Sequence, residues 1–354
     1  MKAAGVCLIV ALIFGGAANA PALSTEEIAN FTGPDRQKIL EEGAKKEGEL
    51  LWIGTFDEDN ARPIVRGFTA RYPYIKINRV RTDSTSALQR VLAELRAKAP
   101  RSDLITSNAV VELEDANAVQ AFKSPVLDSW TAQDRDPSGF SAPLYITYYG
   151  VAAYNSSQVT AAEAPKTYED LLNPKWKGQM VINSNESGVL FFISFLRMYL
   201  GDAKAEAYLE RLAQQKVAMR AESARTVLAL VAAGDYKIMI NPFLVHVGEL
   251  VRKGAPIDVT MQDPVAVSDN PMLLAKMAPH PYSTMLLIDY LLGPEAQGML
   301  SNTGYFPANP AVAASPDLKP YQPQAKGFGK FRVDDRDFGE MMPDTQAWYA
   351  RIFE

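Results

Sequence analysis

The sequence predicts an α/β protein of two lobes, each a mainly parallel sheet flanked by helices, with a C-terminal helical tail. Short apolar segments alternate with amphipathic helical segments in both halves of the chain, and an extended stretch, residues 142–155, separates the halves. At about 3.3 Å per residue, the strand-forming part of this stretch spans about 36 Å, roughly twice an ordinary strand. We therefore expect it to leave one sheet, cross a gap above a cleft and enter a second sheet.

The first half of the chain alternates helix and strand signals. Ser24 begins a first helix, and Gly48 ends a second, polar one. The elements expected next are a buried strand at 50–53, a helix at 62–72, a strand at 75–80, a helix from 82 to 95 and a strand at 103–105. Such strand, helix, strand units favour a parallel sheet.

Polar segments follow each of these three strands, at residues 55–57, 81–85 and 106–108. In open α/β sheets, ligands collect at the carboxyl ends of the strands, so these segments are candidate ligand contacts. Each of them can equally be a helix cap without any functional role.

The extended stretch carries four aromatic or polar side chains of interest. By the two-residue period of a strand, Tyr145, Thr147 and Tyr149 share one face and Tyr148 points to the other. Either set can line the cleft, or the tyrosines can be core packing beside a sheet edge. We select Tyr148 as the candidate ligand contact.

The second half repeats the plan of the first. The expected elements are a short helix and turn at 168–178, a strand at 180–182, a helix at 189–200, a helix at 223–233 and a strand at 238–240. A strand at 265–276 and a helix at 283–292 then return the chain to the first lobe. A terminal helix from 345 is expected to dock through Trp348, Ile352 and Phe353.

The start of the chain has the three parts of a secretory signal. Lys2 is the charged start, residues 6–14 are apolar, and Ala18 to Ala20 form a cleavage site, so the mature protein begins near Pro21. The expected organisation is a signal peptide at 1–20, lobe 1 at 21–143 and 267–310, lobe 2 at 144–266 and a C-terminal extension at 311–354. The apolar stretch is too short to remain as a membrane anchor, which indicates a periplasmic protein.

Composition excludes several classes of function. Lys and Arg total 36 against 41 Asp and Glu, a net charge of −5 without a basic cluster, so nucleic acid is not an expected partner. The single cysteine, Cys7, lies in the signal segment, which leaves the mature chain without thiol catalysis, disulfides or cysteine-bound zinc. The two histidines, His246 and His280, belong to no recognisable triad, and phosphate-loop and Gly-x-Ser-x-Gly motifs are absent, so an enzyme is not expected.

Six motifs in order resemble the periplasmic solute-binding proteins of ABC importers, type II, iron(III)-like branch, known as extracellular solute-binding protein family 1. They are Glu94 with residues 101–105, residues 145–156, residues 171–178, residues 278–281, residues 291–297 and residues 304–310. The resemblance implies the type II periplasmic-binding-protein fold, a small-molecule solute held between lobes that close by a hinge, a monomer, and delivery to an ABC permease in the inner membrane. A sensor subunit would share this fold.

The resemblance also bears on iron. Where the family binds iron, two adjacent tyrosines follow the strand at 237–241, and this chain has Phe243 and Leu244 there. The family's histidine and glutamate ligands fall at Asp57 and Asn108. Because ferric ion prefers anionic oxygen ligands, direct iron binding is not expected, and we predict neither a metal site nor a cofactor.

In the resemblance, the loop at 183–188, the helix start at Arg225 and Asn241 surround a bound anion, and helix N-termini suit anions. We favour a small anionic organic solute; the alternatives are a cationic or polar solute such as a polyamine, held by Asp57 and Glu186, or chelated iron. The predicted ligand contacts are Thr55, Phe56, Asp57, Arg81, Thr82, Thr106, Ser107, Asn108, Tyr148, Asn185, Glu186, Ser187, Arg225, Thr226, Asn241 and Phe243.

Overall fold

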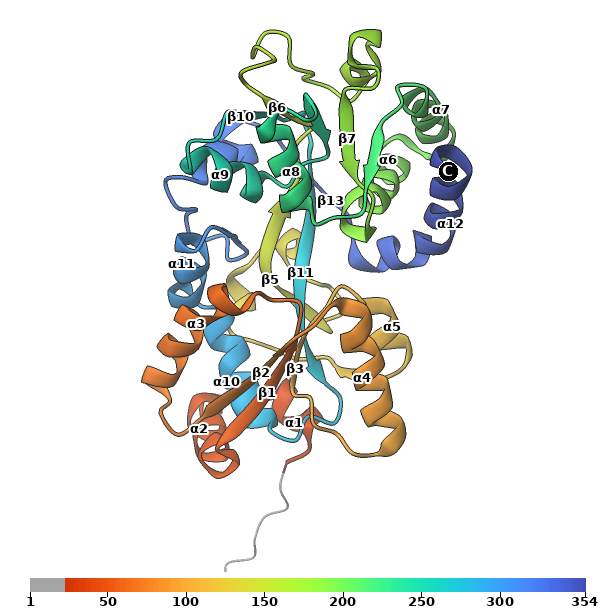
Figure 1. The fold of residues 1–354 in the computed structure, drawn as a ribbon. Helices are drawn as coiled ribbons and strands as arrows, with labels where there is room; N and C mark the ends of the chain where they lie inside the picture. Colours follow the sequence, from red (N-terminus) through yellow and green to blue (C-terminus); the bar gives the residue numbers. More distant parts are fainter. Residues whose placement is uncertain (1–22) are drawn as a thin grey trace, which may run out of the picture.

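A computed structural model describes residues 23–354 and shows two lobes joined near the middle of the molecule (Figure 1). The predicted signal peptide lies outside the described residues. In the described part of the chain, none of the helices combines the length and the apolar composition that crossing a membrane requires.

Lobe 1 is built on an eight-stranded sheet with the order β12-β5-β11-β3-β1-β2, to which β4 and β13 are added along β11. Its strands are β1 (Glu49–Gly54), β2 (Lys76–Arg81), β3 (Leu104–Thr106), β4 (Val119–Gln120), β5 (Ser141–Tyr148), β11 (Val265–Ala275), β12 (Phe306–Pro307) and β13 (Lys330–Arg332).

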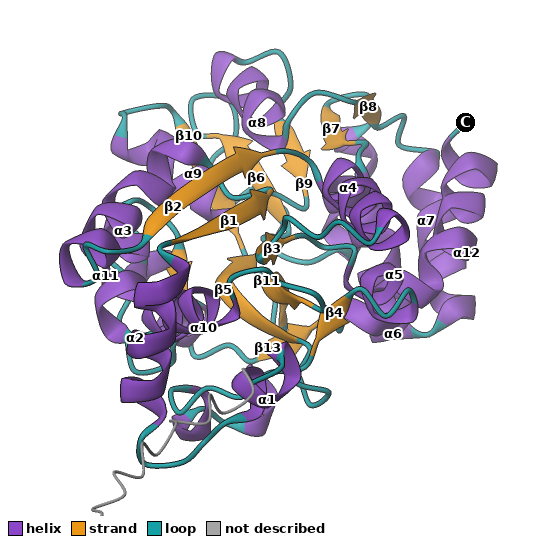
Figure 2. Ribbon diagram, turned by 90° about the horizontal axis from the view of Figure 1, so that it is seen from below, coloured by secondary structure: helices purple, strands orange, loops and turns teal. Residues whose placement is uncertain are grey.

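Helices cover both faces of the lobe 1 sheet. They are α1 (Thr25–Asn30), α2 (Arg36–Glu47), α3 (Glu58–Arg71), α4 (Ser84–Ala97), α5 (Val110–Asp115), α10 (Pro281–Leu292) and α11 (Pro294–Asn302). In the view from below, α2, α3, α10 and α11 lie on one side of the strands and α4 and α5 on the other (Figure 2).

Lobe 2 has a five-stranded sheet with the order β10-β6-β9-β7-β8. Its strands are β6 (Ala152–Asn155), β7 (Met180–Asn183), β8 (Ala218–Arg220), β9 (Ile238–Ile240) and β10 (Ile257–Thr260), and its helices are α6 (Phe191–Leu200), α7 (Asp202–Ala213), α8 (Ala224–Ala233) and α9 (Leu244–Arg252). A π-helical turn, Glu186–Leu190, leads into α6.

Both sheets contain parallel and antiparallel strand pairs. The predicted parallel pairing is found where two strands are connected through a helix. β1 pairs in parallel with β2 and β3, and β7 pairs in parallel with β8 and β9. The strands that continue into the crossings, β5 and β11, pair antiparallel because one leaves lobe 1 and the other returns to it.

The predicted crossing is divided between two strands. β5 stays in the lobe 1 sheet through Tyr148, and β6 begins in lobe 2 at Ala152, so the boundary predicted after residue 143 is too early. Between them, a Cβ on Gly150 would lie 2.7 Å from Val259 and 2.9 Å from the carbonyl oxygen of Thr260. Glycine therefore allows the outgoing chain to pass close beside the returning one.

The C-terminal segment makes a third connection between the lobes. β13 pairs in parallel with the start of β11 in the lobe 1 sheet, and the helix that follows, α12 (Asp335–Phe353), packs on α6 and α7 of lobe 2. The predicted docking side chains Trp348, Ile352 and Phe353 contact the lobe 2 core. The helix begins at Asp335 instead of residue 345, because the carboxylate of Asp334 caps it by accepting from the N–H groups of Arg336 and Asp337.

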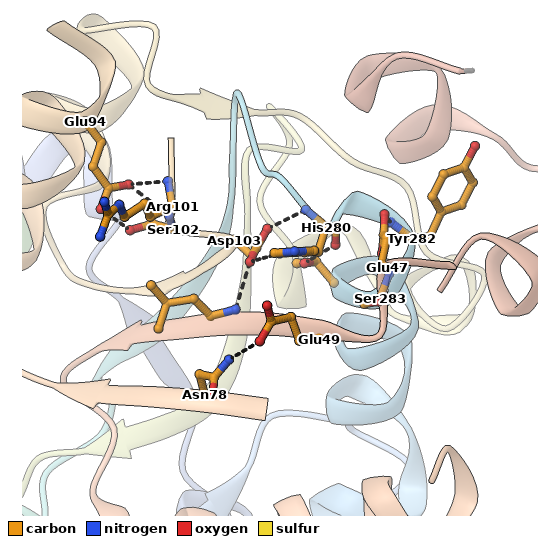
Figure 3. Close-up of polar contacts among 12 residues, drawn as sticks. Glu47, Glu49, Asn78, Glu94, Arg101, Ser102, Asp103, His280, Tyr282 and Ser283 are labelled. Carbon is orange, nitrogen blue, oxygen red and sulfur yellow. Dashed lines mark hydrogen bonds and ion pairs between the residues drawn. The ribbon is translucent and has the colours of Figure 1, made fainter. Parts of the chain in front are cut away.

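Two of the sequence motifs meet in lobe 1 (Figure 3). Asp103 accepts hydrogen bonds from the N–H of Leu51 at 2.8 Å and of His280 at 2.7 Å, and its second contact with His280 joins it to ring Nδ1 at 2.9 Å. Glu94 accepts from the N–H groups of Arg101 and Ser102. These motif residues hold backbone segments together before β3 and before α10, so their role is structural.

Candidate ligand-binding site between the lobes

A cavity of about 350 Å³ lies between the lobes, and both lobes and the C-terminal segment contribute to its lining. The lining residues are Thr55, Asp83, Ser84, Thr85, Asn108, Tyr145, Thr147, Tyr149, Asn185, Phe191, Phe243, Ser268, Asp269, Asn270, Val333, Asp335 and Phe338. Its volume is at the lower end of the range for small-molecule pockets.

The lobe 1 wall is polar. Thr55 follows β1, Ser84 and Thr85 begin α4, and Asn108 follows β3, all at the carboxyl ends of parallel strands. The backbone N–H of Asn108 donates to Oγ of Ser84 at 3.1 Å, which joins two of these loops. The sheet therefore presents hydroxyl and amide groups to the cavity, as the strand-end rule predicts.

The hinge strands form another part of the wall. In β5 and β11, Thr147 pairs with Ser268 and Tyr145 with Asn270. The hydroxyls of Tyr149 and Ser268 are 3.1 Å apart, and the amide of Asn270 donates to the hydroxyl of Thr147 at 2.9 Å. Burial raises the pKa values of Tyr145 and Tyr149 well above the ordinary value, so both side chains are neutral phenols at physiological pH.

The lobe 2 wall is largely aromatic. The ring of Phe191, at the start of α6, stacks on Tyr149 with centroids 4.0 Å apart, and Phe243 meets the same ring edge-on at 5.0 Å. Asn185, in the loop after β7, is the polar contribution of this lobe. The cavity thus has an aromatic side opposite a hydroxyl-rich side.

The C-terminal segment contributes Val333, Asp335 and Phe338. The ring of Phe338 lies 6.1 Å from that of Phe191. Just before them, Arg332 forms an ion pair with Asp269 of β11 and lies 3.7 Å from Asp134. Desolvation raises the pKa of Asp269 and, more strongly, the pKa of Asp335, which is also close to the charge of Asp269.

The charged groups of the cavity are all acidic. Among the described lining residues there are three carboxyl groups, those of Asp83, Asp269 and Asp335, and neither lysine nor arginine. Arg332 offsets Asp269 from behind the wall. The described wall therefore disfavours a fully charged anion and suits a cation or a neutral polar molecule.

Comparison with known proteins assigns the family. The profile of bacterial extracellular solute-binding proteins matches residues 64–325. The chain belongs to this family. It is therefore the solute-binding component of an ABC importer.

Individual relatives agree with the family. The chain is 22% identical over 333 residues to iron uptake protein A1 of Synechocystis sp., covering 88% of this chain and 87% of that protein. The solved structure of Trichodesmium IdiA (FutA), in complex with iron and citrate ligands, superposes with a TM-score of 0.72 at 22% identity, over 86% of this chain and 99% of that one. Apo ferric ion-binding protein A of Pasteurella haemolytica gives 0.73 at 19% identity, over 86% and 98%. The structural matches confirm the two-lobed periplasmic-binding-protein fold.

Four of the ligand contacts predicted for this solute-binding protein line the cavity: Thr55, Asn108, Asn185 and Phe243. The side chains of Glu186 and Ser187 lie outside the described part of the structure. The remaining predicted contacts lie elsewhere, for reasons that differ between them.

Phe56 and Tyr148 are core residues and not stacking platforms. Phe56 is 1% exposed and stacks on Trp52 with ring centroids 5.6 Å apart. Tyr148 packs edge-on against Phe306 at 4.7 Å, on the face of β5 opposite to the cavity. The two-residue period separated the faces of the stretch correctly, but the face with Tyr145 and Tyr149 is the one that lines the cavity.

Several other predicted contacts have local structural roles. Asp57 caps α3, Thr226 bonds to Ser223 at the start of α8, and Arg225 forms a 3.1 Å ion pair with Glu249. The N–H of Thr82 donates to the carbonyl oxygen of Gly54, at the end of β2. Arg81 is exposed at the same point.

Thr106, Ser107 and Asn241 are buried beside the cavity without lining it. Oγ1 of Thr106 accepts from the indole N–H of Trp52 at 3.3 Å, and Oγ of Ser107 accepts from the N–H of Ala109. Asn241 has a positive φ of 53° and donates to the carbonyl oxygen of Gly188 at 3.4 Å. These side chains hold the turns that carry the lining residues.

The two positions at which the resemblance implies a tyrosine pair in iron-binding members hold apolar residues. Phe243 lines the cavity, and Leu244, the next residue, is fully buried. Within the described residues, no group of three or more His, Cys, Asp and Glu side chains is arranged to hold a metal ion.

The lining residues absent from the predicted contacts come from the start of α4, from β5 and the residue after it, from Phe191 of α6, from β11 and from the C-terminal segment. Ser84 and Thr85 were in a candidate segment, but Asp269, Asp335 and Phe338 carried no motif. One signal in the sequence could have pointed to the C-terminal contacts. The segment 330–335 combines a short strand-forming part, which contains Arg332, with an aspartate pair that can cap a following helix.

Proposed function

We propose that this chain captures, in the periplasm, a small organic solute with a positively charged or neutral polar head and an apolar or aromatic body. It then delivers the solute to an ABC permease in the inner membrane. The observation that carries this is the charge of the cavity: three carboxyl groups and no lysine or arginine among its described lining residues. The five aromatic side chains of the lining, Tyr145, Tyr149, Phe191, Phe243 and Phe338, suit an apolar body or an organic cation.

The anionic solute favoured by the sequence has less support. Its main counter-charge was Arg225, whose side chain is 55% exposed and already paired with Glu249. The N-terminus of α4 faces the cavity, but the carboxylate of Asp83 already accepts from the N–H of Ser86 at 2.8 Å. The position that an anion would use is therefore occupied by the chain's own carboxylate.

Chelated iron is a second candidate, and a specific observation favours it: a relative with the same fold binds iron with citrate. A chelate brings its own oxygen ligands, so it would not need the tyrosine pair that is replaced here by Phe243 and Leu244. The anionic citrate would, however, lie against the three carboxyl groups of the cavity.

The proposed export rests on the signal sequence at residues 1–20. The proposed delivery to the permease rests on membership of the solute-binding family. The lobes would close by a hinge motion at the three segments that connect them, and the closed, ligand-bound protein would be the form that the permease recognises.

A thermal-shift screen followed by calorimetry tests the ligand class. The panel contains primary and quaternary amines, polyamines, neutral amino acids, sugars, carboxylates, phosphonates and ferric citrate. We expect stabilisation by amines or by polar aromatic molecules. Micromolar binding of a carboxylate or phosphonate, with no amine bound, would overturn the proposed ligand class; binding of ferric citrate alone would support the second candidate.

A further inference from the structure

The C-terminal segment enters the ligand cavity from outside the region that the family profile matches. The match ends at residue 325, whereas β13 and α12 follow it. Three lining residues, Val333, Asp335 and Phe338, come from this segment. The N–H of Val333 donates to the carbonyl oxygen of Val267 at 2.9 Å, which holds the start of α12 beside β11.

We propose that Asp335 determines the charge selectivity of the site: its carboxylate, which lines the cavity at the start of α12, is the counter-charge for the cationic group of the ligand. This inference rests on the proposed function, because it requires a cationic ligand. It adds a residue from the C-terminal segment to a site otherwise built from the two lobes.

Position supports this assignment. Asp335 is the first residue of α12 and is half-buried. It lines both the ligand cavity and a second cavity of about 120 Å³, and Asp269 also lines both. One helical turn further on, Phe338 supplies an aromatic ring to the same cavity, so an acid and a ring are presented side by side by one helix.

The charged groups around Asp335 explain why it is the available acid. Asp269 on β11 is paired with Arg332, and Arg332 also lies near Asp134, so the positive charge of Arg332 is already shared between these two carboxylates. Asp334, Asp136 and Asp269 repel a negative charge on Asp335, and Arg332 partly offsets them. Oδ1 of Asp269 is buried and has no hydrogen-bond partner among the described residues.

Desolvation is the largest cause of the raised pKa of Asp335, and repulsion from Asp269 comes next. Both effects favour the protonated form of Asp335 in the free protein. When an ammonium group enters, the carboxylic acid loses its proton to water and the resulting carboxylate pairs with the ammonium. The cavity then gains one positive charge and loses one proton, so its net charge stays the same and the cost of burying the ligand's charge is reduced.

The test uses the full chain with phenethylamine and putrescine as probes and 2-phenylethanol as the neutral analogue of the first. Calorimetry in phosphate and in Tris buffers, which differ in ionisation enthalpy, gives the number of protons released per amine bound. We expect release of up to one proton, and an affinity that rises with pH across the titration of free Asp335. The Asp335→Asn variant should bind the amine at least about tenfold more weakly, without proton release.

Two variants serve as controls. Asp337→Asn removes an exposed carboxylate two residues further along α12 that lines neither cavity, so amine affinity and proton release should stay near the wild-type values. Asp335→Glu should restore proton release and most of the affinity, which a merely structural role of Asp335 would not predict.

The outcomes separate this inference from the proposed function. Amine binding that keeps its affinity and proton count in Asp335→Asn would overturn the inference and leave the ligand class standing. Failure of every amine to bind the wild-type chain would overturn the cationic ligand class, and the role of Asp335 with it.

Discussion

The guanidinium of Arg336, in the first turn of α12, forms an ion pair with the carboxylate of Glu114 on α5 of lobe 1. Further along the same helix, Thr345 accepts from the guanidinium of Arg197 on α6 at 3.2 Å, and Arg351 pairs with Glu206 on α7 at 2.5 Å, both in lobe 2. α12 is thus attached to lobe 2 along its length and to lobe 1 at its start. The Arg336 pair links the lobes outside the cavity.

Ligand binding is expected to compact the molecule, and loss of the Arg336 pair to weaken binding. Arg336→Gln removes a partly exposed ion pair worth up to about 1 kcal/mol, so the affinity should fall by up to about fivefold. Small-angle scattering should show a smaller radius of gyration with ligand in the wild type. Arg336→Lys retains the charge and is the control; an unchanged radius on saturation with ligand would contradict hinge closure.

We expect the aromatic ring of Phe243 to contribute more to ligand affinity than Arg225 at the start of α8. Phe243→Ala removes a cavity ring that contacts Tyr149, and we expect the affinity to fall at least about tenfold. Arg225→Ala should leave the affinity within about twofold, because Arg225 does not line the cavity. Isothermal titration of both variants measures this, and the reverse order of effects would restore the anionic hypothesis.

Asp57 is expected to affect stability and not binding. Its carboxylate accepts from the N–H of Asp59 at 2.9 Å and of Asn60 at 3.3 Å, so Asp57→Ala should lower the free energy of unfolding by about 1 kcal/mol. Asp57→Asn keeps a capping side chain and should recover most of this. Urea unfolding gives the energies, and loss of ligand affinity in both variants would instead place Asp57 in the site.

Ferric citrate is expected to produce no visible phenolate absorption. The raised pKa values of Tyr145 and Tyr149 oppose the deprotonation that a ferric phenolate requires, and Tyr149 is hydrogen-bonded to Ser268. Titration with ferric citrate followed by visible spectroscopy tests this. A purple one-to-one complex that disappears in Tyr149→Phe would show that a tyrosine of the crossing binds iron directly.

Stability is expected to fall in mild acid because of His246. Burial, followed by the charge of Arg225, lowers the pKa of His246 from 6.5 to about 4, so the unfolded chain binds a proton before the folded one does. Stability from this group is present above pH 6.5 and is lost as the pH falls towards 4, by about 3 kcal/mol. Urea unfolding across this range should show a smaller loss in His246→Gln, and an equal loss in both proteins would exclude His246 as the cause.

Local patterns were sufficient for most elements of the fold. The apolar run at Leu50, the cap at Ser223 and the stop at Gly234 each act within a few residues, so strands and helices could be read from neighbouring positions. The same holds for Thr55 and Asn108, since the ends of parallel strands always meet at one edge of a sheet. Strand β13 escaped because its signal is three residues long and mixed with charges.

The rest of the site depended on contacts between distant parts of the chain. The period of a strand separates Tyr148 from Tyr149, but only the pairing of β5 with β11 and the approach of Phe191 decide that Tyr149 lies in the cavity. Asp335 reaches the cavity because β13 pairs with β11. The paired residues are about 65 positions apart in the sequence, so no local pattern encodes the contact. The sequence by itself determined the elements, the two lobes and the family; the tertiary structure decided which side chains meet, because side-chain proximity across a cleft depends on how the sheets and the C-terminal helix pack together.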